Sequence, residues 1–132
     1  MKSSQLNSNE PPPAASASSP HDNPCYGTDS TTAALDVMAD DGISYLLPYA
    51  QFLYAQRIAN PVLEKEPDAP PEKLLVHFAQ ADVVVLGSGL KRLEAGIQKY
   101  ELRFVKSADR RLAATFNTHV TGVTLTLTNQ NI

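Results

Sequence analysis

The sequence predicts an α+β domain: a small, mainly antiparallel four-stranded sheet with helices packed mainly on one face, preceded by a disordered N-terminal arm. Three observations indicate this fold class. Residues 83–86 form the most apolar run, and a Gly-Ser-Gly turn and an amphipathic segment follow it directly. Residues 119–128 alternate between apolar residues and threonine, which is the clearest strand pattern in the chain. The first 32 residues are rich in Ser, Pro, Asn and Ala.

Length and composition exclude several classes of protein. The 132 residues supply about one domain, too few for a complete six-stranded dinucleotide-binding domain. Residues 1–71 hold three basic and nine acidic side chains, and residues 72–132 hold eight basic and five acidic ones. This mildly basic half lacks the basic face of a nucleic-acid-binding protein, so we do not expect a nucleic acid partner. No apolar run approaches the roughly 20 residues that span a bilayer, so we expect no membrane contact.

The single cysteine, Cys25, excludes an intramolecular disulfide and fits a reducing compartment. Lys2 is followed by polar residues in place of the apolar region of a secretory signal. We therefore expect a cytoplasmic protein. Residues 1–40 are predicted to be a disordered or mostly disordered arm, because they contain too few large apolar side chains to offset the entropy lost on ordering. A short helix over residues 31–39 is the alternative for the end of this arm.

A helix is predicted within residues 41–60, with Ser44 as its N-cap, Asn60 before the stop at Pro61 and a kink near Pro48. One broad apolar stripe would contain Ile43, Leu46, Leu47, Ala50, Leu53, Tyr54 and Ile58. A second face would present Tyr45, Tyr49 and Phe52. We expect this second face to contact a protein partner or a second copy of the chain, as a homodimer. The alternative is that the arm or the following connector covers it.

The proline-rich residues 61–71 are predicted to be an extended connector, and residues 72–129 the compact α+β core. Within the core we expect strands over 74–78, 83–86, 101–106 and 119–128, with helices over 89–99 and 108–116. The first two strands are expected to form a hairpin. The continuous apolar run predicts that Val84 is buried on both faces of the sheet.

The Gly87-Ser88-Gly89 turn follows a strand and opens a helix, as in the first turn of a dinucleotide-binding unit. Asp109 follows this turn at about the sequence separation expected of an acidic residue that binds ribose. Against this function, Arg92 occupies the third glycine position, and the preceding hairpin implies an antiparallel partner strand. The alternative is a tight strand-to-helix turn that needs glycine for its backbone conformation.

The helix predicted after this turn has a basic face. Lys91, Arg92 and Lys99 lie opposite its apolar stripe. Together they define an alternative function, a nucleotide- or nucleic-acid-binding module that contacts phosphate through the turn and this face. An ordinary solvated helix surface explains the same bases. Arg110 and Arg111 lie nearby in the sequence.

No set of residues carries the pattern of a catalytic or metal site. His77 and His119 fall on or beside predicted strands, but no cysteine or carboxylate has ligand spacing near either. Ser88 lacks the context of a nucleophile elbow, and Cys25 lies in the predicted arm. We therefore expect no enzyme, no metal and no cofactor. The sequence favours a small non-catalytic protein-interaction module.

Overall fold

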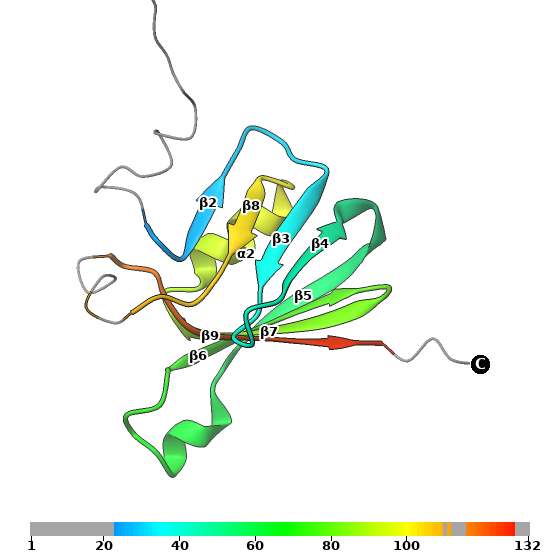
Figure 1. Cartoon of the computed structure of the whole chain (residues 1–132). Helices are drawn as coiled ribbons and strands as arrows, with labels where there is room; N and C mark the ends of the chain where they lie inside the picture. The colour runs from blue at the N-terminus through cyan, green and yellow to red at the C-terminus, as the bar shows by residue number, and fades with distance from the viewer. Residues whose placement is uncertain (1–22, 110, 112–115, 129–132) are drawn as a thin grey trace, which may run out of the picture.

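The computed structural model describes residues 23–109, 111 and 116–128, which form two four-stranded sheets (Figure 1). The strands are β2 (Tyr26–Thr28), β3 (Ala34–Met38), β4 (Ser44–Pro48), β5 (Phe52–Ala59), β6 (Glu72–Phe78), β7 (Ala81–Ser88), β8 (Leu102–Val105) and β9 (His119–Leu127). The helical segments are the 3-10 turns η1 (Tyr49–Gln51) and η2 (Pro61–Glu64) and the α-helix α2 (Lys91–Gln98).

The first sheet has the strand order β2-β8-β3-β4. β3 and β4 form an antiparallel hairpin in which Leu35 lies opposite Leu47 and Val37 lies opposite Tyr45. β8 comes from the second half of the chain and runs parallel to β3, while β2 is antiparallel to β8 on its other side. Residues that lie opposite each other on neighbouring strands point to the same face of a sheet. The side chains on the face that packs into the core are those of Leu35, Val37, Tyr45 and Leu47.

The second sheet has the order β5-β6-β7-β9, and every neighbouring pair is antiparallel. Buried residues alternate with half-buried ones along β6 and β7, as expected for a sheet with one face in the core. The inward side chains are Leu74, Val76, Phe78, Ala81, Val83 and Val85. On the outer face, Val84 lies between Leu75 of β6 and Thr124 of β9 and stays partly exposed.

The core lies between the two sheets, because buried side chains from both sheets form one hydrophobic cluster. Leu90, which precedes α2, and Leu93 and Ile97 of α2 belong to this cluster. On the other side of α2, Lys91, Arg92 and Ala95 are exposed. The helix is therefore amphipathic and covers one end of the core, as its apolar spacing predicts.

The turn between β3 and β4 is tied to β9 through Asp40. Its backbone N–H donates to the Val123 carbonyl at 2.9 Å. Its carboxylate accepts from the Val123 N–H and from the Ser107 hydroxyl, each at 3.0 Å. These bonds connect a turn of the first sheet to an edge strand of the second.

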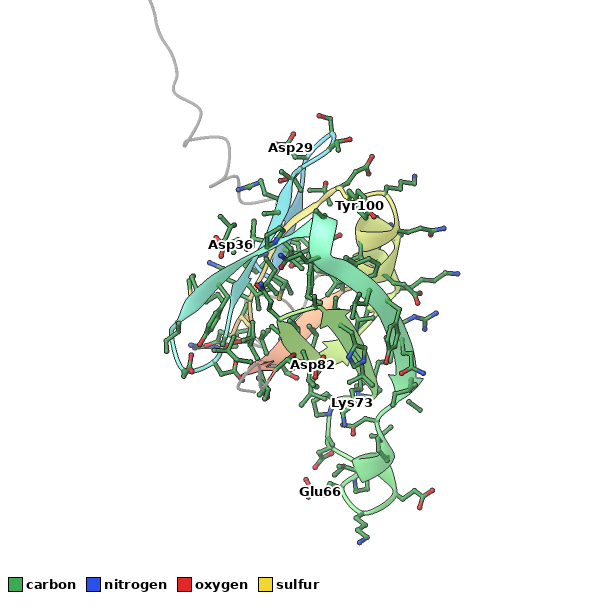
Figure 2. All side chains as sticks on the ribbon, turned by 90° about the vertical axis from the view of Figure 1, so that its right-hand side faces the viewer. Asp29, Asp36, Glu66, Lys73, Asp82 and Tyr100 are labelled. Carbon is green, nitrogen blue, oxygen red and sulfur yellow. The ribbon has the colours of Figure 1, made fainter. Side chains whose placement is uncertain are left out.

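The chain passes from the first sheet to the second at η1. Pro48 precedes this turn with an extended backbone, φ −64° and ψ 132°. Tyr49 is buried at the turn, and its ring stacks on Tyr100 at a centroid distance of 4.8 Å. Figure 2 shows β4 and β5 diverging from this turn, which lies near Tyr100.

The predicted α+β architecture, one sheet with helices mainly on one face, is wrong. The described residues form a mostly β fold of two sheets, with one α-helix described in full. The prediction failed because it took sheet-forming strands only from residues 72–129. Four further strands, β2 to β5, lie before residue 60. β2, β3 and β4 form the second layer together with β8, and β5 joins the sheet of β6, β7 and β9.

The predicted helix within residues 41–60 is also wrong, since this segment forms β4, η1 and β5. Its apolar residues fit a helical period and a strand period equally in places, and Pro48 favours two strands over one helix. Proline lacks an N–H and is tolerated at the end of an edge strand, which is its position in β4. Tyrosine, phenylalanine and isoleucine favour strands as well.

The described part of the arm predicted over residues 1–40 is folded. Residues 1–22 lie outside the described part of the chain, but residues 23–40 contain β2 and β3 in place of a tail or a short helix. The connector 61–71 begins with the 3-10 turn η2, which Asn60 caps by accepting from the Val62 N–H. Most of the helix predicted over 108–116 lies outside the described residues.

The remaining predicted elements are present in the structure. The strands expected over 74–78, 83–86, 101–106 and 119–128 correspond to β6, β7, β8 and β9, and the helix expected over 89–99 corresponds to α2. The hairpin of β6 and β7 also forms as predicted. The expectation that Val84 is buried on both faces is wrong, because only the inner face of β7 enters the core.

Candidate functional site

The aromatic residues predicted to share a helix face lie on three elements. Tyr45 is in β4, Tyr49 is in η1 and Phe52 begins β5. Tyr45 and Phe52 are half-buried against the core, and Tyr49 is only 3% exposed. Phe52 meets Phe78 edge-on, with 5.7 Å between ring centroids. The helix face on which the interaction hypothesis depended does not form, and the rings turn toward the core.

Tyr49 joins the two halves of the chain inside the core. Its hydroxyl donates a hydrogen bond of 2.7 Å to the carbonyl of Leu102 in β8. Burial raises the pKa of the Tyr49 phenol well above its ordinary value, and the neighbouring Tyr100 raises it further. The phenol therefore stays neutral and acts as a structural donor.

Replacing Tyr49 with phenylalanine should lower the free energy of unfolding by about 1–2 kcal/mol at pH 8, because the buried Leu102 carbonyl loses its donor. Since the folded pKa is raised, wild type retains its full stability below pH 10 and loses it as the pH rises further, when the unfolded phenol ionises. At pH 11 the deficit of the Y49F variant should shrink by about 1.4 kcal/mol. Urea unfolding at both pH values measures this, and an unchanged deficit contradicts it.

Exposed apolar side chains concentrate in one segment of the chain. Nine large hydrophobic residues are exposed among the described residues, and six of them lie between residues 43 and 62. These six are Ile43 (50%), Leu46 (70%), Leu53 (60%), Tyr54 (52%), Ile58 (39%) and Val62 (42%). We call them the exposed apolar segment. It runs from the residue before β4, through β4 and β5, to the second residue of η2.

Sequence reasoning assigned most of these residues to the wrong surface. A helical period placed Leu46, Leu53 and Tyr54 on the stripe facing the core, whereas they are exposed. The strand period separates them correctly in β4, where exposed Leu46 alternates with inward Tyr45 and Leu47. The signal that would have found the segment is Pro48, which favours two strands over one helix.

Gly87 and Ser88 are the last residues of β7, so the chain passes from β7 into α2 at Gly89, and a carboxylate of the chain occupies the helix end. Glu72 of β6 accepts a hydrogen bond of 2.8 Å from the Leu90 N–H. The same carboxylate lies 3.9 Å from Arg57 of β5. A phosphate at this helix end would have to displace Glu72.

The two glycines of this turn are required by close backbone packing. A Cβ on Gly87 would lie 2.0 Å from the His119 carbonyl oxygen. A Cβ on Gly89 would lie 2.1 Å from the Asn117 carbonyl oxygen, and its φ of +63° is left-handed as well. The strand-to-helix turn predicted as the alternative to a nucleotide site therefore explains Gly89, whereas the close packing of β7 on β9 explains Gly87.

The basic residues of the alternative function are exposed around α2. Lys91, Arg92 and Lys99 project to the surface, and no ion pair joins any of them to another described residue. Arg110 lies outside the described residues. Arg111 forms an ion pair with Asp109 at 3.3 Å. Hydrogen bonds from the backbone N–H and the guanidinium of Arg111 lower the pKa of Asp109. The acid considered for ribose binding is thus engaged with its own neighbour.

The two strand histidines lie against opposite ends of β7. His77 is opposite Asp82, and His119 is opposite Ser88. The Nδ1 of His77 lies 2.8 Å from the Asp82 carboxylate, and Tyr54 stacks on the imidazole at 4.3 Å. Within the residues that the structure describes, no group of three or more His, Cys, Asp or Glu side chains could hold a metal ion.

Cys25 is buried beside β9. Its Sγ lies 3.3 Å from the Val120 N–H, which donates to it, and 3.8 Å from the Val120 carbonyl. Burial raises the pKa of this thiol. A buried thiol with a raised pKa is a poor nucleophile, so this arrangement favours a packing role.

Most of the polar groups described above bond within the fold, whereas the side chains of the exposed apolar segment are open to solvent, with Tyr54 also stacked on His77. Compared with known proteins, the chain matches no family model, no curated protein and no solved structure. Every helix in the described residues is too short or too polar to cross a bilayer. The candidate functional site is therefore the exposed apolar segment.

Proposed function

We propose that this domain is a non-catalytic protein-interaction module that contacts a protein partner or a second copy through its exposed apolar segment. The observation that carries the proposal is the concentration of six of nine exposed large hydrophobic side chains within residues 43–62. Single exposed apolar residues are ordinary on protein surfaces, whereas a contiguous apolar patch is typical of an interface. Within the segment, Tyr54 and Ile58 lie on the same outer face of β5. The cytoplasmic location expected for it is supported by the unpaired Cys25 thiol.

The surroundings of the polar residues support a non-catalytic role. Cys25, Tyr49 and Glu72 are each committed to a hydrogen bond within the fold. A catalytic group needs a free functional atom at a site that substrate can reach. The runner-up function, nucleotide or nucleic-acid binding, has its turn capped by Glu72 and gains no support from this geometry.

Site-specific photocrosslinking in cells tests the proposal. A benzophenone side chain at Leu46 or at Leu53 should give discrete covalent adducts with a protein partner or with the chain itself. The matched control is the same group at Ala95, which is exposed on α2 outside the segment. Absence of adducts from both segment positions, or equal adducts from the control, would show that the segment is not an interface.

Titration with ADP and with a single-stranded oligonucleotide tests the runner-up function, nucleotide or nucleic-acid binding. We expect no binding of either at physiological salt. Salt-sensitive binding that disappears in the double variant Lys91→Ala/Arg92→Ala would replace the proposed function with the runner-up.

A further inference from the structure

β5 differs from the other edge strands of the two sheets. β2 has three residues, and β4 has five and ends at Pro48. Along its first half, β9 is engaged by other parts of the chain, since Val120 accepts from the Ala108 N–H and Val123 bonds twice to Asp40. β5 has eight residues without proline. Short strands, proline, β-bulges and covering elements are the usual protections of a sheet edge. In β5 the register shift is confined to its start, between Phe52 and Tyr54, and α2 contacts the strand on its inner side, where Glu94 holds Arg57. The backbone edge beyond Tyr54 lacks these protections.

The backbone groups at the free edge of β5 follow from its pairing with β6. The Asn60 N–H donates across to the Pro71 carbonyl at 3.0 Å, so Asn60 faces β6. Alternate residues of an antiparallel strand face opposite neighbours. The N–H and C=O groups of Ala55, Arg57 and Ala59 therefore point to the free edge. Among the residues that the structure describes, no hydrogen bond reaches these groups.

Solvent reaches this edge. The side chain of Arg57 is 32% exposed, and the exposed fraction of the whole residue is larger. The backbone of Arg57 is therefore exposed to solvent. Its charge does not protect the edge, because the guanidinium is held by Glu94 of α2 at 3.1 Å and lies near Glu72. Arg57 lies opposite the core residue Leu74, so this network is on the inner side of the sheet. In Figure 2, β5 borders its sheet on the right and runs down to the lobe that carries Glu66.

We propose that two copies of this chain pair antiparallel along β5, with the two-fold axis at Gln56, and join their sheets into one of eight strands. This inference rests on the proposed function and names the partner. The register places Tyr54 of each copy opposite Ile58 of the other on the outer face. Both side chains are exposed in the single chain, at 52% and 39%. Aromatic and β-branched residues are a favourable cross-strand pair.

Alternative registers of the same pairing are less favourable. An axis at Arg57 sets two guanidinium groups directly opposite each other, and like charges in that position destabilise a strand pair. An axis at Ala55 sets Tyr54 opposite Gln56 and leaves the aromatic ring without an apolar partner. With the axis at Gln56, each Arg57 lies opposite Ala55 of the second copy, and the two Gln56 amides can hydrogen-bond to each other.

Sedimentation equilibrium of the full chain with charge variants at Gln56 tests the pairing. Wild type should move from the 14.3 kDa monomer toward a dimer as its concentration rises. Gln56→Lys should weaken dimerisation at least about tenfold, because it sets two positive charges opposite each other at the axis. An equimolar mixture of Gln56→Lys and Gln56→Glu should dimerise again. The matched control, Thr124→Lys, adds the same charge on the same outer face of the sheet, but in β9, and should dimerise like wild type.

Amide hydrogen exchange gives a second measurement. The N–H groups of Ala55 and Arg57 should exchange more slowly at high than at low wild-type concentration, and Gln56→Lys should remove this difference. A monomer at every concentration, a dimer that Gln56→Lys leaves unchanged, or equal weakening by Thr124→Lys would each overturn the β5 pairing.

The failure of this pairing is distinguishable from failure of the proposed function. If wild type stays monomeric while Leu46 and Leu53 still crosslink to a different protein, the interaction function stands and the second copy is the wrong partner. If wild type is monomeric and crosslinking also fails, both proposals are wrong.

Discussion

Replacing Val85 with aspartate should abolish cooperative folding at 25 °C. Val85 is 1% exposed and lies in β7 between Leu74 and Val123, which are also buried. An aspartate there would be an unpaired charge in the core, and its cost exceeds the about 5–15 kcal/mol by which a domain of this size is stable. Far-ultraviolet circular dichroism during a thermal scan should show no cooperative transition.

The matched control is Val84→Asp, one residue earlier. Val84 points to the outer face, where it is only partly buried between Leu75 and Thr124. An aspartate there reaches water, so we expect a folded variant destabilised by about 1–2 kcal/mol. If Val84→Asp unfolds the domain as completely as Val85→Asp, the outer face of this sheet is buried and the two-sheet arrangement is wrong.

This pair of variants marks one limit of prediction from sequence. Residues 83–86 are apolar at every position, and such a run is typical of a strand buried on both faces. The structure buries only Val83 and Val85, because the first sheet and α2 cover one face. The run alone cannot reveal this, since three strands of the covering sheet, β2, β3 and β4, come from far away in the sequence.

The segment between residues 41 and 60 shows a different limit. Its apolar residues recur at spacings that suit a helix, and only Pro48 and the abundance of aromatic residues argue for strands. The pairing of β3 with β4 and of β5 with β6 decides the outcome. Strand propensity depends on such partners more than helix propensity does, so local reasoning favoured the wrong element.

The elements after residue 72 could be predicted because their signals are local. The apolar and threonine alternation of β9, the apolar spacing of α2 and the glycine turn before it each lie within a few residues. The contact that fills the helix end is not local. Glu72 reaches Leu90 across 18 positions of sequence, and only the hairpin of β6 and β7 brings them together. A phosphate site at this turn therefore looked more open in the sequence than it is in the fold.

Three glycine-to-alanine variants separate backbone strain from steric clash, and Gly89→Ala should be the most damaging. Gly89 has a left-handed φ of +63°, and its Cβ would also lie 2.1 Å from the Asn117 carbonyl oxygen. Both costs apply, so we expect a loss of about 3–5 kcal/mol in the free energy of unfolding. Gly87→Ala should cost about 2–3 kcal/mol, because it meets the His119 carbonyl without a left-handed φ.

Gly42→Ala isolates the remaining cost. Gly42 has a φ of +90° in the turn between β3 and β4, and a Cβ there would meet no atom within 4 Å. Gly42→Ala should lower the free energy of unfolding by about 1 kcal/mol, which is the cost of the backbone conformation alone. Urea unfolding should rank the losses Gly89, Gly87, Gly42. If Gly89→Ala is as mild as Gly42→Ala, residues 117–119 do not pack against the turn, and the glycines would again need an explanation outside the fold, such as a ligand that approaches their backbone.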